Sequence, residues 1–110
     1  MKLPIYKHED SRRTLIEWIA DFPIRMCKVL IVKEDSELGN HYHNNKIDNF
    51  FLLKGSGEYR FGEGEWIPLH EDDCLRAEAG VAHTFKLKAG SVLLEASTTP
   101  YVKEDEIQIC

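Results

Sequence analysis

The sequence predicts an all-β protein, built as a barrel or sandwich of short strands. Short segments rich in β-branched, aromatic and other apolar residues recur along the chain, and turn-forming residues separate them. No apolar pattern of helical period runs for a useful length. The chain has 110 residues, of which 43% are hydrophobic. We therefore expect a single domain with one core over residues 1–110, without repeats or linkers.

The expected elements follow in order. A polar N-terminal arm covers residues 1–12, and a first strand covers 14–19 because β-branched and aromatic residues dominate there. Asp21-Phe22-Pro23 breaks it. Residues 25–33 form the longest strand candidate, apolar on both faces toward its end, which is typical of a strand packed on two sides. The remaining strands are expected at 41–43, 47–54, 58–61, 66–69, 74–77, 83–87 and 91–97.

The segments between these strands carry turn signals. Residues 34–37 are polar and are predicted as a loop, Gly55-Ser56-Gly57 as a turn, and 62–65 as a hairpin loop. The last residues, 98–110, form a charged tail in which 101–107 is a candidate short helix.

Charge and composition exclude several classes. Fourteen lysine and arginine residues against 19 acidic residues give a net charge of −5, and no basic stripe is present, which argues against nucleic acid as the main partner. No apolar run approaches the ~20 residues needed to span a bilayer. The N-terminus lacks the apolar region of a signal peptide, so a cytoplasmic location is expected, with no membrane partner.

Three cysteines, Cys27, Cys74 and Cys110, are far apart and form no C-x-x-C pair. Reduced structural thiols are the expected state in a cytosolic protein. A role of Cys27 or Cys74 as a metal ligand or nucleophile is the alternative, and no local motif supports it.

Two histidines one residue apart organise the chain. On an extended backbone His41 and His43 point to the same face and can aim both imidazoles at one point. Asp48 has the opposite parity and rejoins their face only if the chain turns at 44–46, where the residues are turn-prone. His83 follows in a separate segment after a glycine.

Three imidazoles and one carboxylate are an N/O ligand set suited to one divalent first-row metal. The sequence does not distinguish Zn, Mn, Fe, Ni or Co. One alternative is that a lone histidine is a surface residue or a satisfied core residue. The other is that the His41–His43 pair lies on an exposed strand face without any metal.

At these residues the sequence resembles the cupin family. The first cupin motif has a His-x-His pair, an acid after four residues and a glycine six residues beyond, which here are His41, His43, Asp48 and Gly55. The second has a Gly-x-x-His core, here Gly80-Val81-Ala82-His83. The resemblance implies a cupin-type double-stranded β-helix, a jelly-roll barrel with little helix, and a metal held by the three histidines and Asp48.

The chain departs from the family pattern at four positions. Asp48 stands where the family usually has glutamate, and its side chain is one methylene shorter. Asp35 falls at the early glycine of the first motif. Glu78 falls at the proline of the second motif, and Leu87 at its final asparagine.

A further resemblance concerns cupins that isomerise or epimerise nucleotide-linked keto-sugars. The stretch 10–17 is similar to their Asp-x-Arg-Gly-x-Leu opening, with Arg13 in place of the glycine. Gly39-Asn40-His41-Tyr42-His43 resembles metal-binding cupin domains of capsular-sugar enzymes. The end of the chain is similar to a Tyr-x-x-x-Asp-x-Ile tail, here Tyr101, Asp105 and Ile107. These similarities imply an isomerase or epimerase that moves a proton next to a carbonyl.

The candidate walls of the site mix aromatic and polar residues, which suits a small polar, sugar-like molecule. Candidates for substrate binding are Phe50, Phe85 and Arg76, and candidates for proton transfer are Tyr59, Glu95 and Lys28. Each has a plainer alternative: a barrel-wall aromatic for Tyr59, a strand-face carboxylate for Glu95, a partly exposed strand residue for Lys28, and a surface ion pair for Arg76.

Two other functions use the same residues. One is an Fe(II) dioxygenase, and the other is a non-catalytic binding or sensor module. For assembly we expect a homodimer, because outward-facing Phe51 and Leu53, with Trp18 and Trp66, give more apolar surface than one small barrel hides.

Overall fold

The computed structural model describes residues 1–43, 46–99 and 106–108, with the backbone alone for 40–43 and 106–108. These residues form strands and no helix, so nothing helical among them is long enough to cross a membrane. The strands are β1 (Lys2–Leu3), β2 (Ile5–Glu9), β3 (Thr14–Trp18), β4 (Met26–Ile31), β5 (Ser36–His43), β6 (Asp48–Lys54), β7 (Gly57–Phe61), β8 (Ile67–Leu69), β9 (Cys74–Ala77), β10 (His83–Leu87), β11 (Val92–Ser97) and β12 (Glu106–Gln108).

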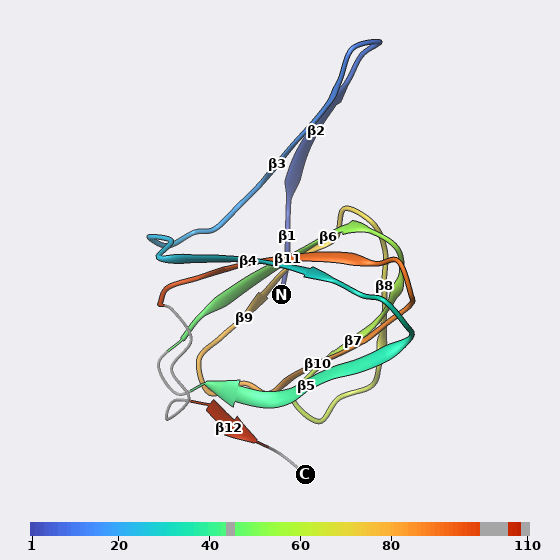
Figure 1. Cartoon of the computed structure of the whole chain (residues 1–110). Coiled ribbons are helices and arrows are strands. Elements are labelled where there is room, and N and C mark those ends of the chain that lie inside the picture. Colours follow the sequence, from blue (N-terminus) through green and yellow to red (C-terminus); the bar gives the residue numbers. More distant parts are fainter. Residues whose placement is uncertain (44–45, 100–105, 109–110) are drawn as a thin grey trace.

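Two five-stranded sheets face each other and enclose the core (Figure 1). The first sheet has the order β1-β9-β6-β11-β4 and the second has the order β12-β5-β10-β7-β8. All neighbouring strands are antiparallel. The predicted barrel of two packed antiparallel sheets is therefore confirmed.

Strand parity determines which side chains fill the barrel. In β6, Phe50 and Leu52 point inward and are at most 3% exposed, while Phe51 points outward. The inward residues of both sheets form one apolar cluster. Its buried members are Val32, Phe50, Leu52, Tyr59, Leu69, Leu75, Ala77, Phe85, Leu87 and Leu93.

Gly55 ends β6 in a conformation that only glycine adopts readily. Its φ is +101°, and a Cβ there would lie 2.6 Å from Ser91 Cα. The predicted turn after β6 is thus built on a glycine that cannot be replaced without moving the chain.

The outer face of the first sheet is covered in part by the chain's own N-terminal region. The Trp18 ring stacks on Phe51 at 5.7 Å between centroids, and Asn49 Nδ2 donates to Ile19 O at 2.7 Å. Phe51 is consequently 1% exposed. The expectation that Phe51 and Trp18 leave free apolar surface is wrong, because they cover each other.

Three local expectations also differ from the structure. Residues 5–18 form an antiparallel hairpin, β2–β3, rather than a polar arm followed by a strand, and β5 begins at Ser36, inside the predicted loop. Residues 106–108 form a strand on the edge of β5, not a helix. The hairpin projects from the barrel and accounts for the long axis of a molecule that measures 46 × 31 × 23 Å (Figure 1).

Candidate active site

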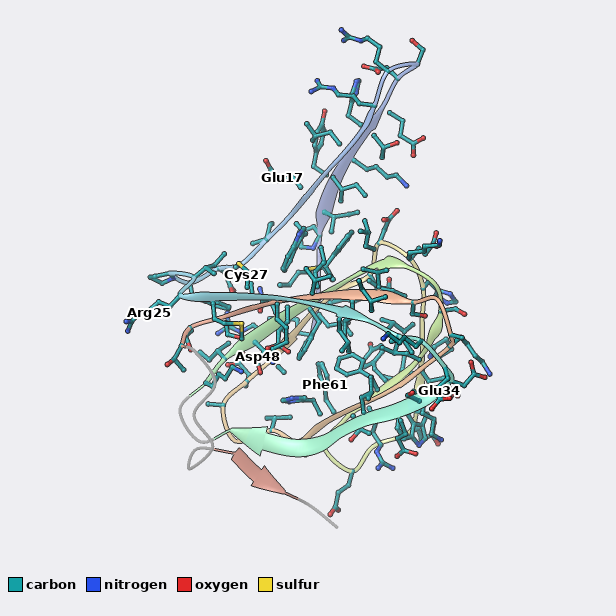
Figure 2. All side chains as sticks on the ribbon, in the orientation of Figure 1. Glu17, Arg25, Cys27, Glu34, Asp48 and Phe61 are labelled. Carbon is teal, nitrogen blue, oxygen red and sulfur yellow. The ribbon has the colours of Figure 1, made fainter. Side chains whose placement is uncertain are left out.

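Four charged side chains gather inside one end of the barrel. Asp48 is the first residue of β6, and Ser97, the last residue of β11, lies opposite it in register. Glu95 and Lys28 face each other across β11 and β4. Lys46 reaches the same place from the segment before β6. Figure 2 shows Asp48 and Phe61 in the space between the two sheets.

These groups form a connected network. The Ser97 hydroxyl donates to Asp48 Oδ1 and also lies 3.3 Å from Glu95 Oε2. Lys46 Nζ lies 3.7 Å from Asp48 Oδ1 and 3.5 Å from Glu95 Oε2. Lys28 Nζ approaches the same Glu95 oxygen at 3.8 Å. Two carboxylates and two ammonium groups thus balance in charge around one hydroxyl.

Burial differs among the members of the network. The side chains of Lys46 and Asp48 are each 2% exposed, that of Glu95 is 15% exposed, and that of Lys28 is 48% exposed. A buried charge is tolerated only when it is paired and hydrogen-bonded. Lys46 therefore pairs with both carboxylates inside the barrel. Glu95 and Lys28 remain accessible to a molecule that enters this end of the barrel.

Lys46 was not among the predicted site residues. Its neighbours Asn44 and Asn45 suggested an exposed turn, yet Lys46 is nearly fully buried. One signal was present: Lys46, Asp48 and Phe50 alternate with period two, as the inward face of a strand does.

Aromatic side chains lie next to the charged network. The Phe50 ring is 5.5 Å from the His83 ring and 4.8 Å from that of Phe85, with the latter pair edge-to-face. His83 is 5% exposed and Phe85 is 3% exposed. The structure therefore brings together Phe50, Phe85 and His83, on the inner faces of two different sheets, as the sequence predicted.

The two remaining predicted metal ligands, His41 and His43, lie on β5, where only the backbone is described. The register of β5 and β10 places His41 opposite His83, with an irregularity between His83 and Thr84. Gly39 forms this irregularity: its φ is +97°, and a Cβ would lie 2.6 Å from His83 O. The side chains of His41 and His43, and residues 44–45 of the predicted turn, lie outside the described residues, so the four-ligand site stays a prediction.

The described ligands have chemistry that suits a metal. A ligating carboxylate is usually held by a hydrogen bond of its own, and Ser97 supplies one to Asp48 Oδ1. Among the side chains that the structure describes, no three histidine, cysteine or acidic residues group as a metal site. A complete set of metal ligands would require His41 and His43 of β5.

Other candidates lie elsewhere. Tyr59 is 8% exposed and packs in the core, with its ring 5.3 Å from Phe61. Arg76 is directed to the outside of the barrel, where it pairs with Glu78 and Asp21, and these contacts raise the pKa of Arg76. The structure does not bring Arg76 together with the network. Of the two roles considered for Arg76, substrate binding and a surface ion pair, the structure shows the ion pair.

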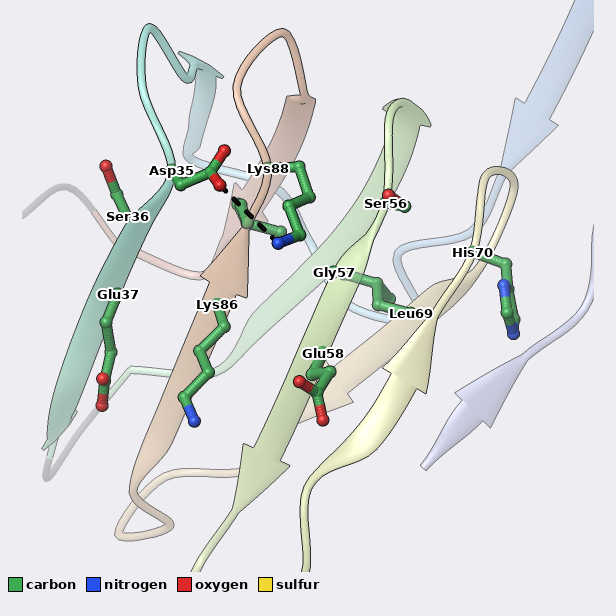
Figure 3. Close-up of a pocket in the computed structure, with 11 residues that line it drawn as sticks. Asp35, Ser36, Glu37, Ser56, Gly57, Glu58, Leu69, His70, Lys86 and Lys88 are labelled. Atoms are coloured by element: carbon green, nitrogen blue, oxygen red, sulfur yellow. Dashed lines mark ion pairs between the residues drawn. The ribbon is translucent and has the colours of Figure 1, made fainter.

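A separate groove of about 450 Å³ lies at the other end of the second sheet (Figure 3). Glu37, Lys86 and Glu58 occupy one row across β5, β10 and β7. Lys88 Nζ pairs with Asp35 Oδ2 at 3.6 Å. A hydrogen bond from the Ala89 amide, together with the charge of Lys88, lowers the pKa of Asp35. The Asp35–Lys88 pair lies on the open surface, in contrast to the enclosed network at the other end.

The fold and the network define a small β-barrel protein with a charged site inside one end. The chain belongs to the cupin family, because residues 28–100 match the family's cupin domain. No curated protein matches the chain in sequence.

Solved structures with the same fold include 3,4-ketoisomerases and a 3'-monoepimerase. A TDP-fucose-3,4-ketoisomerase from Campylobacter jejuni superposes with a TM-score of 0.84 at 20% identity, covering 99% of this chain and 88% of that one. A 3,4-ketoisomerase from Helicobacter canadensis gives 0.88 at 20% identity, with 99% and 90% covered. A 3'-monoepimerase from Streptomyces bikiniensis, in complex with dTDP-quinovose, gives 0.86 at 17% identity, with 98% and 68% covered.

Proposed function

We propose that this cupin is an isomerase or epimerase that moves a proton next to the carbonyl of a nucleotide-linked keto-sugar. The observation that carries the proposal is the network of Lys46, Asp48, Glu95 and Lys28 inside the barrel end, beside an aromatic wall. The fold shared with ketoisomerases and epimerases supports the same class. A cytoplasmic location belongs to this proposal.

Glu95 has the position expected of the general base. Its carboxylate is partly accessible, and Lys46, Lys28 and Ser97 approach one of its oxygens, Oε2, within 3.8 Å. The carboxylate takes the proton from the carbon next to the carbonyl, and the electron pair of that C–H bond forms the enolate. Return of the proton to the former carbonyl carbon, with transfer of the proton of the adjacent hydroxyl group to the former carbonyl oxygen, gives isomerisation. Delivery of a proton to the opposite face of the original carbon, from a donor on that face, gives epimerisation.

The cations of the network have separate tasks. Lys28, at the rim, can approach the oxygen on which negative charge develops, and Lys46 orients Glu95 from behind. Phe50 supplies a flat apolar surface for the sugar ring next to His83.

The proposal includes one divalent metal, held by His41, His43, His83 and Asp48. When bound, it would polarise the carbonyl as a Lewis acid. Elemental analysis of the purified protein tests it: we expect about one metal per chain, and its loss in His83→Ala. His70→Ala, which removes an exposed histidine, is the control and should keep the metal. Equal metal content in both variants would remove the metal from the proposal.

The activity is tested with TDP-linked 4-keto-6-deoxyglucose and detection of a rearranged sugar by proton NMR. Glu95→Gln should lower the rate by roughly 10²–10⁴-fold. The control is Glu58→Gln, because Glu58 is an exposed carboxylate on β7 outside the barrel. Binding without turnover would favour a sensor module, and oxygen uptake with iron would favour a dioxygenase.

A further inference from the structure

Two cationic side chains on the outer face of the second sheet contact one indole ring. Tyr59 and Phe61 of β7 pack in the core, so Arg60 between them points outward. Lys86 of β10 is exposed and points outward as well. Arg60 Cζ lies 4.7 Å from the centroid of the Trp66 ring, and Lys86 Nζ lies 4.1 Å from it. Two positive charges are therefore held close together outside the barrel.

These two cations have no acceptor within the part of the chain that the structure describes. The Nε atom of Arg60 is buried and has no hydrogen-bond partner there, and Lys86 has neither an ion pair nor a hydrogen bond. Lys88, just beyond the end of β10, differs because it pairs with Asp35. Guanidinium and ammonium groups can only donate, and a buried donor without an acceptor is costly. A ligand with acceptor oxygens would remove this cost.

Acidic side chains lie near Lys86 but do not pair with it. Lys86 is opposite Glu58 of β7 and Glu37 of β5, and Figure 3 shows it between them. Both carboxylates are exposed, and neither forms an ion pair with Lys86. Exposed pairs of this kind contribute little to stability. The ammonium group lies on Trp66 instead, beside the guanidinium group of Arg60.

The two donors suit the oxygens of a phosphate group. An arginine fork binds two phosphate oxygens at once, and a lysine adds a compact second charge, which favours a dianion over a monoanion. The contacts with Trp66 hold both cations in place before a ligand arrives, which lowers the entropic cost of binding. Lys86 also lines the groove of about 450 Å³, so the remainder of a small molecule has room beside it.

We infer that Arg60, Lys86 and Trp66 form a binding site for the phosphate group of a small molecule, on the outer face of the second sheet. Arg60 and Lys86 donate to the phosphate oxygens, and Trp66 orients the two cations. The site lies outside the barrel and contains none of the residues of the proposed active site. It stands whether or not the proposed function is correct.

The first test is a titration with inorganic phosphate at constant ionic strength, followed by NMR through the two indole N–H signals. The Trp66 signal should shift and saturate with a Kd on the order of 1 mM. The signal of Trp18, which stacks on Phe51 of the first sheet, is the internal control and should not move. Equal movement of both signals, or a shift that does not saturate, would overturn the inference.

Acetate distinguishes phosphate from carboxylate ligands in the same titration. It carries a single charge, so it should bind about 10-fold more weakly than phosphate. Acetate that binds as tightly as phosphate would refute the assignment to a phosphate group.

The second test uses variants and calorimetry. Arg60→Gln and Lys86→Gln should each raise the Kd for phosphate by at least about 10-fold, because each removes a charged donor. Lys88→Gln is the matched control: it removes the same charge nearby, from a lysine that pairs with Asp35, and should change the Kd by less than about 2-fold. Glu37→Gln should lower the Kd by about 2-fold, because a competing carboxylate is removed.

Circular dichroism should show these variants folded, since all the substituted side chains lie outside the core. A Kd that rises as much in Lys88→Gln as in Arg60→Gln would mean that phosphate responds only to overall charge. Loss of binding in Lys28→Gln, with Arg60→Gln unaffected, would place phosphate inside the barrel end. Either result would overturn the inference.

Discussion

Lys46 Nζ lies 3.5 Å from Glu95 Oε2, and the lysine side chain is 2% exposed. The two residues are 49 positions apart in the sequence, and the contact forms because β6 and β11 are neighbours in the first sheet. The pair connects the segment between β5 and β6 to β11. Formation of the site therefore depends on the pairing of strands in the first sheet.

Lys46→Met should destabilise the fold by about 3–5 kcal/mol, because Asp48 and Glu95 would lose a buried partner. Urea unfolding measures this loss. Lys28→Met is the matched control, since Lys28 pairs with the same Glu95 from an exposed position, and it should cost at most about 1 kcal/mol. Equal losses in the two variants would contradict the role of Lys46.

Phe51→Ala should cost about 3–5 kcal/mol, because its ring is buried beneath Trp18. Urea unfolding applies here too. Ile67→Ala, at an exposed apolar position, should change the unfolding free energy by about 0.5 kcal/mol or less. A small effect at Phe51 would show that Trp18 does not cover the sheet.

The thiols of Cys27 and Cys74 should react at different rates. Burial raises the pKa of Cys74, which is 1% exposed, while Cys27 is exposed. In a Cys110→Ser variant, a thiol reagent should modify Cys27 at once and Cys74 only after denaturant is added. Equal rates in the folded protein would contradict the burial of Cys74 on β9.

The hairpin turn should depend on pH through Asp10. Its Oδ1 accepts hydrogen bonds from the Arg12 and Arg13 amides at 2.9 and 3.0 Å, and chiefly the Arg12 bond lowers the pKa of Asp10 from its ordinary value of 3.8. A lowered pKa means that the stabilisation is present above pH 3.8 and is lost as the pH falls through the lower, folded-state value. The protection of the two amides from exchange, taken relative to the intrinsic rate at each pH and followed by NMR, should fall over that range.

Asp10→Asn is the control for this experiment, because the amide oxygen still accepts both bonds and does not titrate there. Its exchange should show no such step. A step of the same size in the variant would assign the pH dependence to another group.

Much of the barrel could be predicted from the sequence, because a half-buried strand shows its inward face directly. The alternation at His83, Phe85 and Leu87 and the glycine turn at Gly55 both predicted what the structure contains. The hairpin at 5–18 escaped prediction because its residues are mostly polar and its shape comes from cross-strand register and the Asp10 turn.

Sequence spacing singled out Asp48 and His83, which the structure buries, but missed Lys46, which is buried as well. A lysine after two asparagines is expected in water, since burying an unpaired ammonium is costly. Asp48 in the same segment and Glu95 on β11 together make its burial favourable, and the approach of Glu95 follows from tertiary structure rather than local pattern.

The most direct test of the proposed function is exchange of carbon-bound hydrogen with solvent. The protein should be incubated in D₂O with TDP-linked 4-keto-6-deoxyglucose, and the sugar analysed by mass spectrometry and NMR. We predict one deuterium on a carbon next to the carbonyl or its rearranged position, with the rate lowered strongly in Glu95→Gln and unchanged in Glu58→Gln. Sugar that binds yet gains no deuterium above the protein-free control would contradict the account.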